Sequence, residues 1–284
     1  MYQVTQTKDL FENYVLTDTD SGVTATITPQ RGGMLTSLVK NGHEYLFINP
    51  ENYPSTERPR CAVPVLFPYS GRIKDEVLHI RGGQYPASIH GIAQNMNWKV
   101  LGTDTTDGAS ITIGITSNEE TKKTYPYEFS LEMTYTLKGD TVTIAPVCKN
   151  CDTEDMPFDL GFHPYFTSSG LDNLTFSMQG ETQFDPGCDE KLPFDGQLKT
   201  SAITGMGSII MNAQSPASFT DGDFGVTVAF GAPYRNVVVW SGMPDRFICV
   251  EPWTGVPNAL NEGTQGCILA PGEVLEGPWT IQIR

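Results

Sequence analysis

The chain has 284 residues and carries 18 lysines and arginines against 33 aspartates and glutamates, a formal net charge of −15. So acidic a composition argues against nonspecific binding to nucleic acid or to an anionic membrane, since both need a positive face, and no apolar run approaches the ~18 residues of a membrane span. Abundant glycine (28) and proline (20) with 10% aromatic residues favour turns and strands over long helices, and exclude disorder.

Residues 1–6 lack the basic start and apolar stretch of a signal peptide, which predicts a cytoplasmic protein. Its six cysteines are therefore expected to be reduced thiols. Cys148 and Cys151 form a lone CxxC pair. A zinc site would need further ligands nearby, and a redox motif a βαβ context. We therefore predict neither a metal site nor a redox role for this pair.

Short segments of alternating apolar and polar residues recur along the chain and predict strands. These segments are 23–28, 77–80, 111–116, 129–137, 141–144, 226–230, 237–240, 247–250 and 279–283. Residues 138–140 form a turn that joins two of them into a hairpin, and 117–124 could form one or two helical turns. The pattern predicts an all-β fold, a large antiparallel β-sandwich with few short helices, as a single domain over residues 1–284.

The chain has four histidines, and two of them lie in unusual settings. His43 belongs to a turn and is expected to be solvated, and His79 to be structural. His90 is followed by Gly91, which lets a backbone or a ligand come close. His163 lies among aromatic residues and next to a proline, where an imidazole could form one wall of a sugar pocket. For both, the alternative is a buried histidine with satisfied hydrogen bonds.

Glu251 follows the apolar run 247–250 and precedes a proline and Trp253. Desolvation there should raise its pKa and make it a usable base near neutral pH, unless it pairs with an arginine for structural reasons.

Arg60 and Arg72 flank a segment whose two prolines favour a shaped loop over a central strand. They could donate to sugar hydroxyls or to phosphate, or be ordinary surface arginines.

Taken together in chain order, these segments resemble the aldose 1-epimerase (galactose mutarotase-like) family, and most of all its divergent bacterial branch. The residues that carry the resemblance are 30–33 (QRGG), 63–68 (VPVLFP) with 71–73 (GRI), 90–93 (HGIA), 160–166 (LGFHPYF), 248–255 (ICVEPWTG) and 269–273 (LAPGE).

The resemblance implies a large β-sandwich with an open cleft, and an isomerase that interconverts the α and β anomers of a free hexose without cofactor or metal. Its only expected partner is the sugar. In that scheme Glu251 takes the proton of the C1 hydroxyl and His163 protonates the ring oxygen. His90 hydrogen-bonds the sugar near the reacting centre and Arg72 holds hydroxyls. Arg60 matches a ligand-binding position of the sugar-phosphate branch.

Two departures from the family pattern bear on the substrate. Gln94 stands where the sugar-phosphate branch usually has an arginine, which weakens the case for a phosphorylated sugar. A substrate-binding aspartate that is frequent in the family cannot be assigned among Asp185, Asp195, Asp221 and Asp223. The alternatives are a hexose-6-phosphate mutarotase, a non-catalytic carbohydrate-binding protein, and a glycoside hydrolase, which would usually need a second carboxylate.

Overall fold

Three antiparallel sheets hold most of the chain, which a computed structural model describes over residues 1–55 and 58–284. The largest has nine strands in the order β16-β20-β21-β26-β12-β11-β10-β9, with β25 also paired to β12. Its strands are β9 (Lys99–Asp104), β10 (Ala109–Thr116), β11 (Phe129–Lys138), β12 (Thr141–Asn150), β16 (Leu174–Gln179), β20 (Gln214–Asp221), β21 (Phe224–Phe230), β25 (Val274–Glu276) and β26 (Trp279–Ile283).

The second sheet has eight strands in the order β18-β17-β19-β22-β23-β14-β6, with β15 paired to β23. Its strands are β6 (Val65–Leu66), β14 (Gly161–Phe162), β15 (Tyr165–Thr167), β17 (Thr182–Asp185), β18 (Glu190–Pro193), β19 (Ser208–Met211), β22 (Asn236–Trp240) and β23 (Phe247–Trp253).

The third sheet has five strands. Its order follows the chain: β1 (Tyr2–Lys8), β2 (Glu12–Asp18), β3 (Val23–Thr28), β4 (Met34–Lys40) and β5 (His43–Glu44). The described residues also include two separate two-stranded sheets and a few short helical turns. The pairs are β7 (Val77–Ile80) with β8 (Gly83–Pro86), and β13 (Met156–Phe158) with β24 (Cys267–Leu269). The helices are α1 (Thr200–Thr204) and α2 (Ala259–Glu262), with 3₁₀ turns η1 (Lys74–Glu76), η2 (Ala93–Asn95), η3 (Thr121–Lys123) and η4 (Leu171–Asn173).

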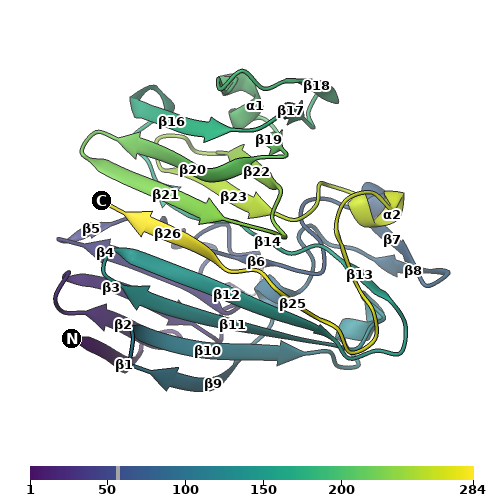
Figure 1. Cartoon of the computed structure of the whole chain (residues 1–284), viewed down its shortest axis with the longest axis horizontal. Coiled ribbons are helices and arrows are strands. Elements are labelled where there is room, and N and C mark those ends of the chain that lie inside the picture. Colours follow the sequence, from purple (N-terminus) through teal and green to yellow (C-terminus); the bar gives the residue numbers. More distant parts are fainter. Residues whose placement is uncertain (56–57) are drawn as a thin grey trace.

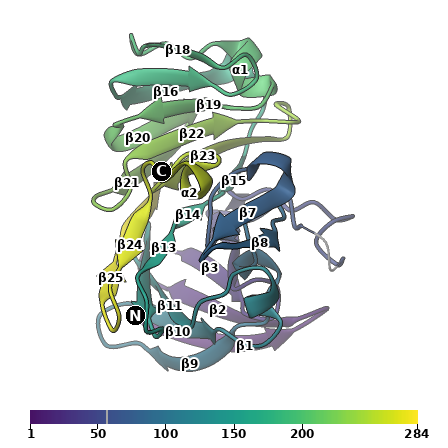
Figure 2. The same cartoon turned by 90° about the vertical axis from the view of Figure 1, so that its right-hand side faces the viewer.

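The nine-stranded sheet forms one layer of the sandwich and the other two sheets lie behind it (Figure 1). In the view turned by 90°, β20 and β21 lie on the left and the β7–β8 hairpin lies on the right (Figure 2). Strand β11 shows why the layers pack: its alternate residues from Phe129 to Leu137 are all buried, because every second side chain of a strand points to the same face. One apolar cluster extends from β2 to β26 through all three sheets.

The structure confirms the β-sandwich with few short helices, and the predicted strands are present. In the predicted hairpin Lys138 pairs with Thr141 across a turn in which Gly139 has a φ of +64°. Within 117–124, where one or two helical turns are predicted, the structure has one 3₁₀ turn, η3. The loop 61–71 contains one two-residue strand, β6, at the edge of its sheet. Across residues 1–55 and 58–284 no helix is long and apolar enough to cross a membrane.

Candidate active site

A cavity of about 210 Å³ at the open face of the eight-stranded sheet brings together four of the five residues singled out in the sequence. His90, His163, Glu251 and Arg72 line it, together with Arg58. Apolar walls come from both tryptophans of β22 and β23 and from residues of neighbouring strands and loops: Trp240, Trp253, Val238, Ile209 and Pro257.

Glu251 lies inside β23, not at its end, because the strand continues to Trp253. It shares a face of the strand with Trp253, whose Nε1 donates a 3.0 Å hydrogen bond to Glu251 Oε2. Only 1% of the glutamate is exposed. Burial raises the pKa of Glu251 well above its usual range, although the Trp253 hydrogen bond and the positive Arg58 act in the opposite direction. The predicted desolvation of this carboxyl is thus present in the structure.

His163 lies in the connection between β14 and β15, directly opposite Glu251. Its Nδ1 is 3.4 Å from Glu251 Oε1, but the angles fall short of a hydrogen bond, and Nδ1 has no other partner among the described residues. Its ring stacks on Tyr165, whose hydroxyl is 3.5 Å from Nε2. Burial, reinforced by the charge of Arg58, lowers the pKa of His163 to about 3. Both pKa shifts therefore favour the uncharged forms of the two side chains over an ion pair.

His90 is oriented by the backbone of the loop that carries Arg72. The Gly71 N–H donates to His90 Nδ1 at 3.0 Å, and the His90 N–H donates to the Gly71 carbonyl oxygen at 2.9 Å. Because Nδ1 accepts a hydrogen bond, the ring proton of neutral His90 is on Nε2. The next residue must be a glycine, since a Cβ on Gly91 would lie 2.3 Å from the Phe67 carbonyl oxygen. His90 therefore presents a donor beside His163, with ring centres 5.2 Å apart.

The two arginines of the cavity are Arg58 and Arg72, whereas Arg60 is exposed and is not among the lining residues. Arg58 is half-buried, and its pKa is lowered by burial and, more weakly, by Arg60 and Arg72. Sequence reasoning missed Arg58. The signal was its place two residues before Arg60 in the same proline-flanked segment, where loop conformation decides which guanidinium turns inward.

The structure also locates the residues at which the sequence departs from the family pattern, Gln94 and the four candidate aspartates. Gln94 is buried, and its Nε2 donates to the Ile89 carbonyl oxygen, so it braces the loop that carries His90. Among the four aspartates, Asp185 precedes a cavity-lining proline but accepts a hydrogen bond from the Gly187 N–H. Asp195 is exposed, and the remaining two line a different cavity.

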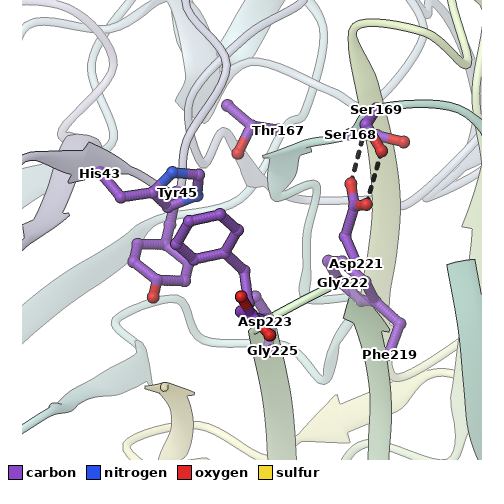
Figure 3. A pocket seen from close by; sticks show the side chains of 12 residues that line it. His43, Tyr45, Thr167, Ser168, Ser169, Phe219, Asp221, Gly222, Asp223 and Gly225 are labelled. Carbon is purple, nitrogen blue, oxygen red and sulfur yellow. Dashed lines mark hydrogen bonds between the residues drawn. The ribbon is translucent and has the colours of Figure 1, made fainter. Parts of the chain in front are cut away.

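That second cavity, of about 400 Å³, lies beside β5 and the β20–β21 hairpin (Figure 3). His43 is half-buried there and stacks on Phe224, so its predicted place in a solvated turn is wrong. Figure 3 shows both oxygens of Asp221 held by Ser169, through its backbone N–H and its hydroxyl. The Asp221 carboxylate is therefore already bound by Ser169. The smaller cavity instead holds a carboxyl and two histidines that can exchange protons, so we take the smaller cavity as the candidate active site.

The family model for aldose 1-epimerase matches residues 13–282. The chain belongs to the aldose 1-epimerase family. Protein LacX (plasmid) of Lactococcus lactis subsp. lactis is 26% identical over 263 residues, 82% of this chain and 85% of that protein. The Slr1438 protein of Synechocystis sp. PCC 6803 has a TM-score of 0.90 at 28% identity, covering 100% and 99% of the two chains.

The family's fold also has a close structural match. A galactose mutarotase-like protein of Clostridium acetobutylicum has a TM-score of 0.85 at 19% identity, covering 100% of this chain and 98% of that one. This likeness confirms the galactose mutarotase-like β-sandwich that the sequence predicts.

Proposed function

We propose that this member of the aldose 1-epimerase family interconverts the α and β anomers of a free hexose without a cofactor. The observation that carries the proposal is the 3.4 Å approach of His163 Nδ1 to Glu251 Oε1 inside a buried cavity. Opening a pyranose ring requires one group to remove the C1 hydroxyl proton and another to protonate the ring oxygen. A carboxyl and an imidazole can do both near neutral pH.

In the proposed reaction the proton that burial favours on Glu251 first moves to His163. Glu251 then accepts the C1 hydroxyl proton as the C1–O bond to the ring breaks, and His163 gives its added proton to the ring oxygen. The open aldehyde rotates about its C1–C2 bond. The ring then closes from the other face, with the two proton transfers reversed, so that both side chains regain their starting states. Each transfer contributes about 10²–10⁴ in rate.

The remaining polar groups would hold the sugar. His90 offers its Nε2–H to a sugar oxygen, because the Gly71 amide already occupies Nδ1. Arg72 and Arg58, which both line the cavity, would donate to sugar hydroxyls. The indole faces of Trp240 and Trp253 would contact the C–H side of the ring. In this assignment Arg58 takes the ligand-binding role that the family resemblance implies for Arg60.

A hexose 6-phosphate is the second candidate substrate, and a specific observation favours it. Arg58 and Arg72 both line the cavity, and two guanidinium groups match the charge and geometry of a phosphate. Gln94 weighs less against this substrate than the sequence suggests, because its side chain is occupied with the Ile89 carbonyl oxygen.

The test is the anomeric relaxation of freshly dissolved α-glucose and α-galactose, followed by polarimetry with and without the protein. A parallel exchange-NMR measurement uses glucose 6-phosphate. Faster relaxation of a free sugar supports the proposal, and acceleration of the phosphate alone selects the second candidate. No acceleration of any sugar, combined with binding detected by calorimetry, would make the chain a carbohydrate-binding protein.

A further inference from the structure

Three side chains with different ligand atoms meet at the candidate active site, and two of them, His163 and Glu251, line its cavity. One atom each of His163, Cys249 and Glu251 lies within 4.8 Å of the other two. Cys249 and Glu251 are two residues apart in β23 and therefore share a face. His163 is brought to the same place because Tyr165, two residues further on, pairs with Cys249. All three are buried.

The spacing suits a small metal ion. Three atoms no more than 4.8 Å apart share a point that lies within about 2.8 Å of each, and Zn²⁺ binds nitrogen, oxygen and sulfur at about 2.0–2.3 Å. An inward movement on the order of half an ångström by each side chain would complete three-fold ligation.

An unpartnered imidazole nitrogen gives an independent indication. His163 is 6% exposed, and among the described residues its Nδ1 has no hydrogen-bond partner. Such a buried polar atom costs about 1–3 kcal/mol. Ligation by a cation would satisfy Nδ1 in the direction in which it already faces Glu251.

The charges also balance. Binding would release the thiol proton of Cys249 and the carboxyl proton of Glu251 to solvent, so a divalent ion with a thiolate, a carboxylate and a neutral imidazole has no net charge. Neutrality favours occupation of a site that is shielded from water. Arg58 and Arg72 face the same cavity and oppose a cation, while neutral His90 adds no charge. Thiolate and imidazole ligands select Zn²⁺ over Mg²⁺ or Ca²⁺.

We propose that His163, Cys249 and Glu251 form a site for a thiophilic divalent cation such as Zn²⁺, and that its occupation blocks the candidate active site. Metal binding itself does not depend on the proposed function. Only inhibition rests on it, because a metal-bound Glu251 cannot accept a proton from the sugar.

The experiment is a Co²⁺ titration of the folded protein, followed by the near-ultraviolet charge-transfer absorption of a cobalt–thiolate bond. Exposed Cys151 and Cys188 are first replaced by serine, since they could bind cobalt on their own. We expect a band in this background that Zn²⁺ removes and Mg²⁺ does not. Cys249→Ser should abolish the band and weaken cobalt binding at least ~10-fold. The matched control, Cys148→Ser, alters an equally buried thiol elsewhere and should keep the band.

Two results would overturn the site: no thiolate band in the background protein, or a band that survives in Cys249→Ser. Should Cys249→Ser fail to fold by circular dichroism, Glu251→Gln takes its place and must weaken cobalt binding as well. Polarimetry in the presence of Zn²⁺ separates this proposal from the function. If the protein is inactive but has a Cys249-dependent band, the metal site stands and the proposed enzymatic function is wrong. If the protein is active but shows no band, the proposed function stands and the metal site is wrong.

Discussion

At the scale of single residues, Glu251 and His163 share the one proton that the proposed reaction moves between them. Burial raises the pKa of the glutamate and lowers that of the histidine, which favours a protonated carboxyl beside a neutral imidazole. This neutral pair has the same number of protons as the carboxylate and imidazolium that the proposed reaction uses. Moving one proton across the contact is therefore enough to prepare the pair, without exchange with solvent.

Glu251→Gln should leave the fold intact and abolish turnover, because an amide fills the same space but accepts no proton from the C1 hydroxyl. The expected loss is at least ~10² in rate, measured by polarimetry. Glu276→Gln, on an exposed position of β25, is the matched control. A rate close to that of the unaltered protein would remove Glu251 from its proposed role as the base.

His163→Asn should likewise cost at least ~10² in rate, because asparagine keeps a polar group but does not titrate. His43→Asn, in the second cavity, provides the control and should not change the rate. A loss below tenfold for His163→Asn would leave His163 as a structural residue stacked on Tyr165.

The pH dependence should follow the proton on this pair. Because burial raises the pKa of Glu251, activity should fall as pH rises through that pKa and the carboxyl loses the proton that the reaction uses. Trp253 donates to the carboxyl and lowers its pKa, so Trp253→Phe should move the alkaline fall to higher pH. The measurement is a pH–rate profile of both proteins. An unchanged or acid-shifted profile would contradict the proton assignment.

At the scale of elements, a buried carboxyl connects the two strands that carry the site. Asp159 precedes β14, and its Oδ1 is 3.5 Å from the hydroxyl of Thr254, which follows β23. The same hydroxyl accepts a hydrogen bond from the Leu160 N–H at 2.9 Å. Gly255 is required beside it, because a Cβ there would lie 2.2 Å from Asp159 Oδ1. Burial raises the pKa of Asp159 to about 7.

Asp159→Asn should stabilise the protein at pH 8 and have little effect at pH 4. Below pH 3.8 both folded and unfolded chains carry the proton, and as pH rises the unfolded chain ionises first, so the unaltered protein loses stability until about pH 7. The difference is on the order of 4 kcal/mol at most, at ~1.4 kcal/mol per pKa unit. Urea unfolding at both pH values measures it, with exposed Asp155→Asn as control. A gain equal at both pH values would contradict the assignment.

At the scale of the whole molecule, the layers are joined by hydrogen bonds as well as by apolar contacts. Tyr135 in the middle of β11 is fully buried, and its hydroxyl donates to the Gly33 carbonyl oxygen at 2.7 Å. Gly33 directly precedes β4 of the five-stranded sheet. One hydroxyl thus ties the large sheet to the sheet behind it, and neither residue lines the candidate site.

Tyr135→Phe should therefore lower the free energy of unfolding by about 1–3 kcal/mol, because it leaves the buried carbonyl oxygen without its partner. The rate of anomeric relaxation should not change. Urea unfolding and polarimetry on the same samples provide the two values. If the free energy of unfolding of Tyr135→Phe equals that of the unaltered protein within experimental error, the Gly33 carbonyl oxygen must have another hydrogen-bond donor in the variant.

The sequence predicts the long strands well and the site only in part. Alternation reveals β10, β11 and β12 because one face of each is buried. It does not reveal β6 or β14, which have two residues each and are buried throughout. Glu251, His90 and His163 could be found from their local motifs. The inward turn of Arg58 could not, because it depends on the path of a loop. Cys249 was detectable from its two-residue spacing to Glu251.

Strand β26 lies in the interior of the largest sheet, where it pairs with β21 on one side and β12 on the other. It follows both of them in the chain, so the sheet consists of two separate halves until Trp279 and its neighbours dock. Each half then presents an unpaired strand edge, which is a template for pairing with other molecules. A chain interrupted before residue 279 would keep both edges open, and aggregation would compete directly with folding.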